Sequence, residues 1–271
     1  MPEGHTLHRL ARELTEVFAG GTVTASSPQG RFAGGAARVN GRSLDSAEAH
    51  GKHLLLSFDG LDEVVHIHLG LYGGLTLVPG TGHPIVGAVR LRLEGRTHTG
   101  DLRGPTSCAL YEPDQVEALL ARLGPDPLRP DADPEAAWRR VKASRTAIAT
   151  QLMNQEVLAG VGNVYRAEVL FRHRLDPFMP GTALDKPTWD AIWADMVTLM
   201  NQGVSSGKID TVNAVHAPEA MGRPPREDRH GGEVYVYRRA GQQCLVCGTP
   251  VRTQVISGRN LFWCPECQER G

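Results

Sequence analysis

Two pairs of cysteines near the end of the chain impose the strongest constraint on its fold. Cys244 and Cys247 form one C-x2-C pair, Cys264 and Cys267 form the other, and sixteen residues separate the pairs. This spacing is typical of a zinc ribbon, in which each pair lies on a tight knuckle and the residues between them form a β-hairpin. We expect the four thiolates to bind one Zn2+; coincidental pairs or a redox dithiol are the alternatives. Four sulfur ligands leave no open coordination position, so the metal is expected to be structural.

The hairpin between the two pairs would present Ser257-Gly258-Arg259-Asn260 at its tip, with Arg259 pointing outward. A terminal segment of about 30 residues is too short to form a core of its own, so its folding should depend on the metal. The fifth cysteine, Cys108, is interpreted as a buried small hydrophobe rather than a nucleophile.

Length and composition narrow the class of protein. The chain has 271 residues and 41% hydrophobic residues, enough for one to three ordinary domains. No apolar run reaches the roughly 18–20 residues of a membrane span, and the sequence MPEGHTLHRL lacks the apolar core of a signal peptide. We expect a cytoplasmic monomer, associated with the nucleoid if the source is bacterial, and no membrane partner.

The charge balance argues at first against a nucleic-acid partner, because the formal net charge is -1. Up to residue 134 the chain carries 12 basic and 16 acidic side chains, and beyond it 17 basic and 14 acidic ones. The positive excess is therefore confined to the second half. Only four of the 29 basic residues are lysines, and Lys52 is the first of them.

Hydrophobic periodicity divides the chain into parts of different character. Apolar residues at helical spacing from Leu7 to Phe18 predict an amphipathic helix that ends at Gly20-Gly21. Five β-type runs separated by turn residues follow: Leu54–Phe58, Glu63–Leu69, Gly74–Val78, Val86–Leu93 and Ser107–Tyr111.

A proline- and aspartate-rich stretch, GPDPLRPDADP at residues 124–134, is typical of a connector. Helical patterns follow it, with a start at Asp133-Pro134-Glu135 and periodic stretches at Ala147–Met153, Val164–Phe171 and Asp185–Met200. Short β-type runs return from Glu233 onward.

The predicted fold class is therefore α+β with several domains. We expect an N-terminal β-sandwich domain with a leading helix at 1–123, a linker at 124–134, a helical domain at 135–232 and a zinc-ribbon β-hairpin at 233–271.

The N-terminus itself contains residues suited to covalent catalysis. Removal of Met1 would expose the secondary amine of Pro2, and an α-amino group titrates near pH ~8, so part of it is neutral and nucleophilic at pH 7. Attack of this amine on an aldehyde-like carbon would give a cationic iminium, which favours elimination. Glu3 is placed to act as a general acid or base.

Four motifs in order resemble the formamidopyrimidine-DNA glycosylase and endonuclease VIII family of base-excision repair enzymes. MPEG resembles the catalytic terminus of that family, and residues 50–55, HGKHLL, resemble its lysine motif. Residues 160–165, GVGNVY, resemble the turn of its helix-two-turn-helix domain, and residues 258–265, GRNLFWCP, resemble its zinc-finger arginine hairpin. The resemblance extends over nearly the whole chain.

The resemblance implies a bifunctional DNA glycosylase and AP lyase that acts on damaged double-stranded DNA. Pro2 would form a Schiff base at C1′ of the flipped-out nucleotide, with Glu3 assisting, and β,δ-elimination would follow. Lys52 would serve as a general acid/base and phosphate contact. Arg259 would hold the phosphate of the extruded nucleotide and assist the second elimination.

Further DNA contacts are implied by the same resemblance. Asn163 would bind a DNA phosphate, although its position before a helix also predicts an ordinary N-cap. Leu71 and Tyr72, in a turn after a strand, would fill the gap left by the flipped base. Arg103 is a candidate for a second wedge. The Leu-Tyr-Gly sequence resembles the endonuclease VIII branch and so favours oxidised pyrimidines.

Some positions depart from the family pattern, and they put the substrate range in doubt. His5 and Thr6 replace a proline and a glutamate of formamidopyrimidine glycosylases, and Gly70 replaces a polar residue usual in the endonuclease VIII branch. The 101–105 loop offers no second aromatic wedge. His66 and His68 on one strand face suggest either a metal pair or ordinary packing, and packing is favoured.

Two other classes of protein compete with the enzyme. One is a non-catalytic protein of the same fold that recognises lesions or bent DNA, and the presence of Pro2, Glu3 and Lys52 argues against it. The other is a transcription or translation factor marked by the zinc ribbon, which would not depend on the N-terminal amine.

Overall fold

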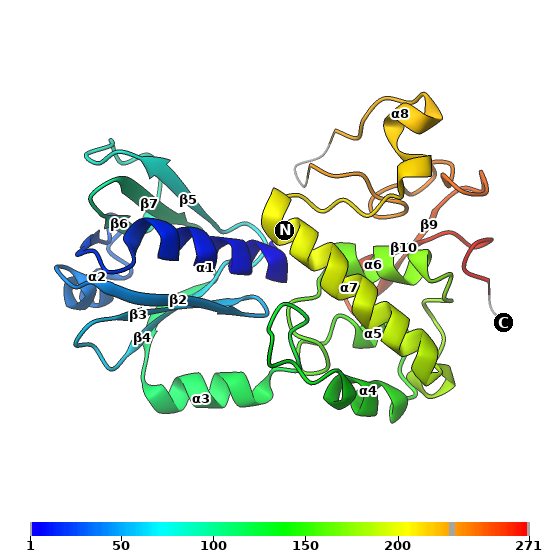
Figure 1. Ribbon diagram of the computed structural model, residues 1–271, viewed down its shortest axis with the longest axis horizontal. Coiled ribbons are helices and arrows are strands. Elements are labelled where there is room, and N and C mark those ends of the chain that lie inside the picture. The colour runs from blue at the N-terminus through cyan, green and yellow to red at the C-terminus, as the bar shows by residue number, and fades with distance from the viewer. Residues whose placement is uncertain (1, 228–230, 270–271) are drawn as a thin grey trace. The chain divides into compact units, whose positions relative to one another are not determined.

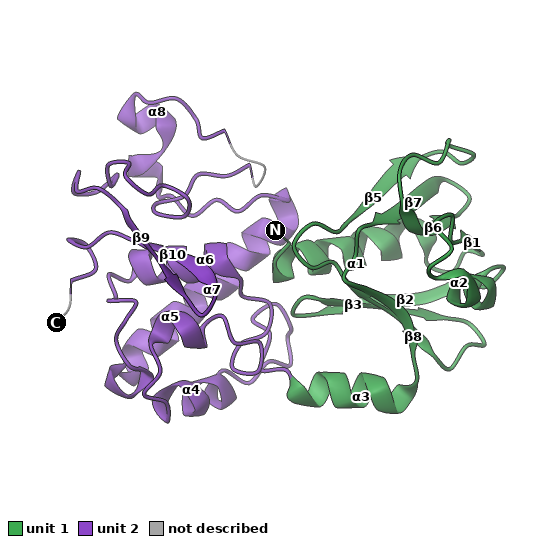
Figure 2. Ribbon diagram, turned by 180° about the vertical axis from the view of Figure 1, so that it is seen from behind, with its two compact units in different colours: residues 1–122 green, residues 123–271 purple. Residues whose placement is uncertain are grey.

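The computed structural model describes residues 2–227 and 231–269. The chain divides into two compact units, residues 1–122 and 123–271 (Figure 2). Each unit has its own hydrophobic core, so each is treated by itself. In the described residues, no helix combines the length and apolar character needed to cross a membrane.

The first unit is a β-sandwich with a leading helix, as the sequence predicts (Figure 1). One antiparallel sheet has the strand order β1 (Thr24–Ser26), β6 (Val89–Glu94), β7 (His98–Arg103) and β5 (Gly74–Pro79). The other has the order β2 (Leu44–His50), β3 (His53–Phe58), β4 (Val64–His68) and β8 (Ser107–Tyr111).

Helix α1 (Gly4–Phe18) contributes the apolar face that the periodicity predicts. Leu7, Leu14 and Phe18 are buried with residues from both sheets in one cluster. The ring of Phe18 fills the space above Gly95, where an added Cβ would lie 2.7 Å from Cδ1 of the ring. A glycine is therefore required at the β6–β7 turn for the helix to pack this closely.

Several elements of this unit were not expected from the sequence. Helices α2 (Ala33–Val39) and α3 (Pro113–Arg122) are present, and so are β1, β2 and β7. Strand β7, HTGDLR, lacks an apolar alternation because Asp101 is buried against arginine rather than against hydrocarbon. The strand expected from Val86 begins at Val89, because residues 80–88 form an irregular loop.

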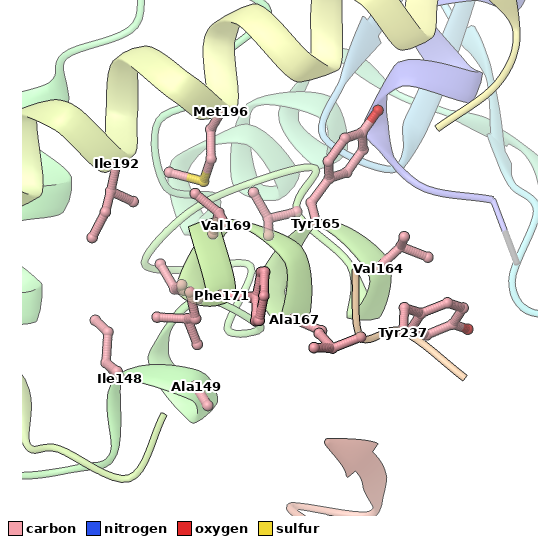
Figure 3. Packing of buried hydrophobic residues seen from close by; sticks show 14 of the residues in the cluster. Ile148, Ala149, Val164, Tyr165, Ala167, Val169, Phe171, Ile192, Met196 and Tyr237 are labelled. Atoms are coloured by element: carbon pink, nitrogen blue, oxygen red, sulfur yellow. The ribbon is translucent and has the colours of Figure 1, made fainter. Parts of the chain in front are cut away.

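The second unit is built around α6 (Asn163–Arg172) and α7 (Lys186–Ser206). Helices α4 (Pro134–Lys142) and α5 (Ile148–Gln151) lie in the same unit, with the short α8 (Pro218–Met221) and the 3-10 turns Gly181–Ala183 and Ala214–His216. Met196 of α7 and Val169 and Phe171 of α6 belong to one buried cluster (Figure 3).

Local capping explains where two of these helices begin. The Asp133 carboxylate accepts a hydrogen bond from Glu135 N at 2.9 Å, and the Asp185 carboxylate accepts one from Thr188 N at 2.8 Å. A proline follows each cap at one of the first helical positions, where its missing N–H is not needed. These starts agree with the sequence prediction.

The zinc-ribbon segment shares the core of the helices. Strands β9 (Arg252–Ile256) and β10 (Arg259–Trp263) form the expected hairpin, and Leu261 and Phe262 are buried in the same cluster as α6. The stretch 124–134, expected to be a connector, also lies against this unit, since Ala159 N donates to Pro125 O at 3.0 Å. The β-type run at 233–237 forms no strand.

Candidate active site and DNA-binding residues

The start of α1 places a carboxylate beside the N-terminal proline. Glu3 occupies the N-cap position with extended backbone and is completely buried, and Pro2 is partly buried. His5 and Thr6 follow in the first turn, where Thr6 Oγ1 lies 3.3 Å from His5 Nε2. Met1, whose removal the expected use of Pro2 as a nucleophile would require, lies outside the described residues.

Lys52 lies in the tight turn between β2 and β3. Gly51 has φ +58, a conformation that favours glycine, and this allows the two strands to pair up to His50 and His53. Lys52 is half-buried. After burial, the positive charge of Lys52 is the next cause that lowers the pKa of His68, so these two side chains share one electrostatic environment.

Three histidines gather on the outer side of the β3–β4 pair. His53 Nδ1 lies 2.9 Å from His66 Nε2, and the His53 and His68 rings are 5.0 Å apart between centroids. His66 Nδ1 also lies 3.3 Å from Ser107 Oγ, and its ring stacks on Tyr111. The histidine rings thus contact one another, Ser107 and Tyr111. These contacts support a packing role for His66 and His68 rather than a metal site.

Burial and mutual repulsion keep these imidazoles neutral. Burial, followed by the positive charges of the other histidines and Arg122, lowers the pKa of His53 to about 3. Burial and the charge of His68 lower the pKa of His66 to about 4. Both rings are therefore uncharged near neutral pH.

The turn between β4 and β5 exposes the two residues expected to act as a wedge. Tyr72 is 92% exposed and Leu71 is 44% exposed. The preceding Gly70 has φ +69, and a Cβ there would lie 1.9 Å from Thr106 Oγ1. The left-handed backbone at Gly70 therefore favours glycine, and a side chain there would require Thr106 to move.

Arg103 at the end of β7 is largely engaged within its own unit. Its Nη2 donates to Asp101 Oδ2 at 2.7 Å, and its Nε donates to Val86 O at 2.9 Å. Asp101 is also held by Arg92 through two hydrogen bonds of 2.7 and 2.8 Å. The side chain of Arg103 remains 36% exposed.

Asn163 is not the N-cap of α6, which corrects the expectation from its position before the helix. Gly162 occupies the N-cap, and Asn163 is the first helical residue. Its Nδ2 donates to Asn260 O at 2.9 Å, and its Oδ1 accepts from the buried Arg166. The side chain therefore joins the start of α6 to the zinc hairpin, one residue from Arg259.

Two charged residues inside α6 were missed by the sequence reasoning. Arg166 and Glu168 are completely buried. The Glu168 carboxylate accepts hydrogen bonds from Tyr235 N at 2.7 Å, Val236 N at 2.9 Å and Tyr237 N at 2.8 Å, and from Thr211 Oγ1 at 2.6 Å. Glu168 thereby holds segment 235–237, which forms no strand. The sequence signal was the position of Arg166 and Glu168 among apolar residues in the middle of α6.

The four cysteines converge as the spacing predicts. The Sγ atoms of Cys244, Cys247, Cys264 and Cys267 all lie within 4.8 Å of one another. A tetrahedron with Zn–S bonds of about 2.3 Å has sulfur–sulfur edges of about 3.8 Å, so the site fits one zinc ion. The hairpin that it anchors turns at Ser257 and Gly258, both with positive φ, and exposes Arg259.

Cys108 lies apart from this cluster, in the core of the first unit. Burial raises the pKa of its thiol to about 12. The thiolate is therefore scarce at neutral pH, which agrees with a packing role.

Comparison with known proteins identifies the family. Residues 1–108 match the formamidopyrimidine-DNA glycosylase N-terminal domain, residues 123–214 match its H2TH domain, and residues 241–270 match the zinc finger found in FPG and IleRS. Endonuclease 8 1 of Mycobacterium tuberculosis is 51% identical over 272 residues, which cover 99% of this chain and 100% of that protein. The chain belongs to the formamidopyrimidine-DNA glycosylase and endonuclease VIII family.

More distant relatives share the fold. Formamidopyrimidine-DNA glycosylase of Thermus thermophilus is 34% identical over 239 residues, 87% of this chain and 86% of that protein. The crystal structure of the MutM (Fpg) protein from Thermus thermophilus has a TM-score of 0.76 at 27% identity and covers 100% of both chains. Lactococcus lactis Fpg in complex with abasic-site DNA has a TM-score of 0.79 at 20% identity, with 99% and 100% covered.

Enzymes of this family are DNA glycosylases with AP lyase activity in base-excision repair, and this chain is one of them. Its cofactor is one structural zinc ion. The family thereby excludes a transcription or translation factor built on the zinc ribbon.

Proposed function

We propose that this enzyme excises oxidised pyrimidines from duplex DNA through a Schiff base on Pro2, followed by β,δ-elimination. The observation that carries the proposal is the completely buried carboxylate of Glu3 directly after Pro2 at the start of α1. A carboxyl group that directly follows the nucleophile is placed to protonate the deoxyribose ring oxygen.

The chemistry begins with the neutral amine of Pro2 after Met1 is removed. Its nitrogen attacks C1′, the bond from C1′ to the base breaks, and the base departs with the proton that the proline nitrogen gives up. The C1′–O4′ bond then breaks as Glu3 protonates O4′, which opens the ring and leaves an iminium between Pro2 and C1′. The iminium acidifies C2′; loss of a C2′ proton breaks the bond from C3′ to its phosphate oxygen, and loss of a C4′ proton then breaks the bond from C5′ to the 5′-phosphate. Lys52 would exchange protons during these steps, as the family's lysine motif implies.

Residues of the second unit would hold the DNA backbone. Asn163 and Arg259 lie on the two segments joined by the Asn163–Asn260 hydrogen bond of 2.9 Å. We infer that this corner binds the phosphate next to the flipped nucleotide, with Arg259 as the cation. The positive excess of the chain beyond residue 134 supports this assignment.

The preference for pyrimidines follows from the wedge turn. Leu71-Tyr72 precedes a glycine pair in the pattern of the endonuclease VIII branch, and the relative at 51% identity is named endonuclease 8 1. Arg103 remains a candidate DNA contact only with the part of its guanidinium that Asp101 and Val86 do not engage.

Borohydride trapping tests the nucleophile. The mature protein, with loss of Met1 verified by intact mass, is reduced on a duplex that contains an abasic site, and the adduct is mapped by peptide mass. We expect the adduct on the Pro2 peptide. An adduct on a lysine peptide, or binding without any adduct, contradicts the proposal, and the second result would indicate the non-catalytic lesion binder.

Glu3→Gln tests the acid, with the exposed Glu16→Gln of the same helix as its control. We expect Glu3→Gln to lose at least about a hundredfold in release of dihydrouracil while still forming the adduct on a preformed abasic site. Equal loss on both substrates would assign Glu3 a structural role instead. Duplexes with thymine glycol, dihydrouracil, 8-oxoguanine and formamidopyrimidine then rank the substrates, and faster release of the purine lesions would contradict the pyrimidine preference.

A further inference from the structure

The exposed apolar side chains of the first unit gather in two loops. In the described part of residues 1–122, the large hydrophobic residues with high exposure are Leu71, Tyr72, Ile85 and Val86. Ile85 is 54% exposed and Val86 is 66% exposed. A monomeric protein seldom exposes neighbouring bulky apolar residues unless they bind something.

Two arginine side chains hold the backbone of the loop that carries Ile85 and Val86. Arg92 Nη1 donates to His83 O at 2.6 Å, and Arg103 Nε donates to Val86 O at 2.9 Å. Asp101 binds both arginines and is itself buried. Burying such a cluster costs desolvation free energy, so its benefit is specificity of conformation rather than stability.

Because the backbone of the loop is pinned at residues 83 and 86, its two apolar side chains are held away from the core. Residues 80–88, GTGHPIVGA, contain no acidic side chain. The only titratable group among them, His83, lies with its Nε2 2.8 Å from Pro79 O. The segment around Ile85 and Val86 thus carries no acidic side chain of its own, and the Glu94 carboxylate contacts the loop near its other end, where Glu94 Oε1 accepts from Gly82 N at 3.0 Å.

The loop runs from one end of the sheet to the other, because Pro79 before it pairs with His98 and Val89 after it pairs with Arg103. Arg103 also pairs with Gly74, two residues after Tyr72, and donates to Val86 O, so the part of the loop that carries Val86 lies toward the wedge turn. The β7–β8 turn lies directly against the wedge turn, since a Cβ on Gly73 would lie 2.9 Å from Gly104 O. The intervening Gly104, Pro105 and Thr106 offer no large apolar group.

We propose that Ile85 and Val86 form a second apolar contact to damaged duplex DNA, beside the Leu71-Tyr72 wedge. This inference rests on the proposed use of that wedge. The two side chains would pack against deoxyribose and base edges where the duplex opens at the lesion, as apolar residues do in kinked minor grooves. Arg92, Asp101 and Arg103 act as positioning residues that hold the contact in place.

Binding to a duplex with a tetrahydrofuran abasic analogue tests the contact, because this analogue supports no elimination. We expect the double variant Ile85→Ser, Val86→Ser to raise the Kd about tenfold through loss of apolar burial. The lyase rate on a true abasic site at saturating enzyme should stay unchanged. Val215→Ser is the matched control, since Val215 is 71% exposed in the other unit.

Three results would overturn the contact: an unchanged Kd for the double variant, an equal loss in Val215→Ser, or photocrosslinking from p-benzoylphenylalanine at position 85 to a second copy of the chain instead of to DNA. Crosslinking to the DNA strand supports it. Failure of the proposed function can be distinguished from failure of this contact. If the proposed function is wrong, the wild-type protein gives no borohydride adduct, whatever the Kd values of the variants.

Discussion

The two units of this enzyme place their buried charges on different elements. In the first, Arg92 and Asp101 are buried on neighbouring strands, and Arg92 donates to His83 O in the irregular loop 80–88. In the second, Arg166 and Glu168 are completely buried in one helix, α6, and Glu168 accepts from the backbone of the irregular segment 235–237. In both units, a segment without regular structure needs a buried partner for its backbone groups.

Removal of the zinc should disrupt the fold of the second unit and have the largest effect on stability and on DNA binding. Structural zinc contributes roughly 10 kcal/mol or more to small zinc domains, and here the hairpin shares its core with α6. We expect Cys264→Ser, or chelation, to abolish tight binding to abasic-site DNA and to lower the Tm of the second unit. Zinc content and Kd are measured together; full binding by metal-free protein would contradict this expectation.

Glu168→Gln tests whether the buried carboxylate organises segment 235–237. An amide has one acceptor oxygen in place of two and brings two N–H donors among backbone donors, so we expect a loss of about 3 kcal/mol in the free energy of unfolding. Urea denaturation measures it. The exposed Glu219→Gln in α8 is the control and should change stability by less than about 0.5 kcal/mol.

Acid should weaken the first unit through its histidines. Unfolded imidazoles bind a proton near pH 6.5, whereas burial and neighbouring charges lower the pKa of His66 to about 4 and that of His53 to about 3. The unfolded state therefore binds more protons between these values, and the free energy of unfolding falls as pH drops from about 6.5 toward 4.

The His66 contribution should be on the order of 3 kcal/mol, and it is fully present above pH 6.5. His66→Leu should flatten the pH dependence of unfolding between pH 6.5 and 4, as followed by denaturation at several pH values. His98→Leu, on the other sheet, should leave that slope intact. An identical slope in His66→Leu and the wild type would remove His66 as its source.

Gly70→Ala tests how far the wedge turn depends on its own backbone conformation and on the neighbouring Thr106. The positive φ and the Thr106 side chain at 1.9 Å from the added Cβ should cost about 1–2 kcal/mol in the free energy of unfolding. Gly74→Ala is the matched change, because its Cβ would meet nothing within 4 Å and its φ is ordinary. Equal thermal stability of the two variants would show that the wedge turn tolerates a side chain.

Local patterns were sufficient for the elements whose cause is local. Spacing identified the four cysteines, periodicity identified α1, and Asp133 and Asp185 marked helix starts that the structure confirms. The family motifs predicted a sandwich, a helical domain and a zinc hairpin, and all three are present. Each of these signals is contained in a short stretch of sequence or in the spacing of the cysteines.

The sequence by itself thus determined the family, the metal ligands and the main elements. Only the tertiary structure decided that Asn163 joins α6 to Asn260 instead of capping the helix, that Arg103 holds Val86, and that His53 lies against His66. The physical reason is the same in each case: the partner is brought near by strand register or helix packing between distant segments, and a buried polar group takes whichever partner that packing supplies.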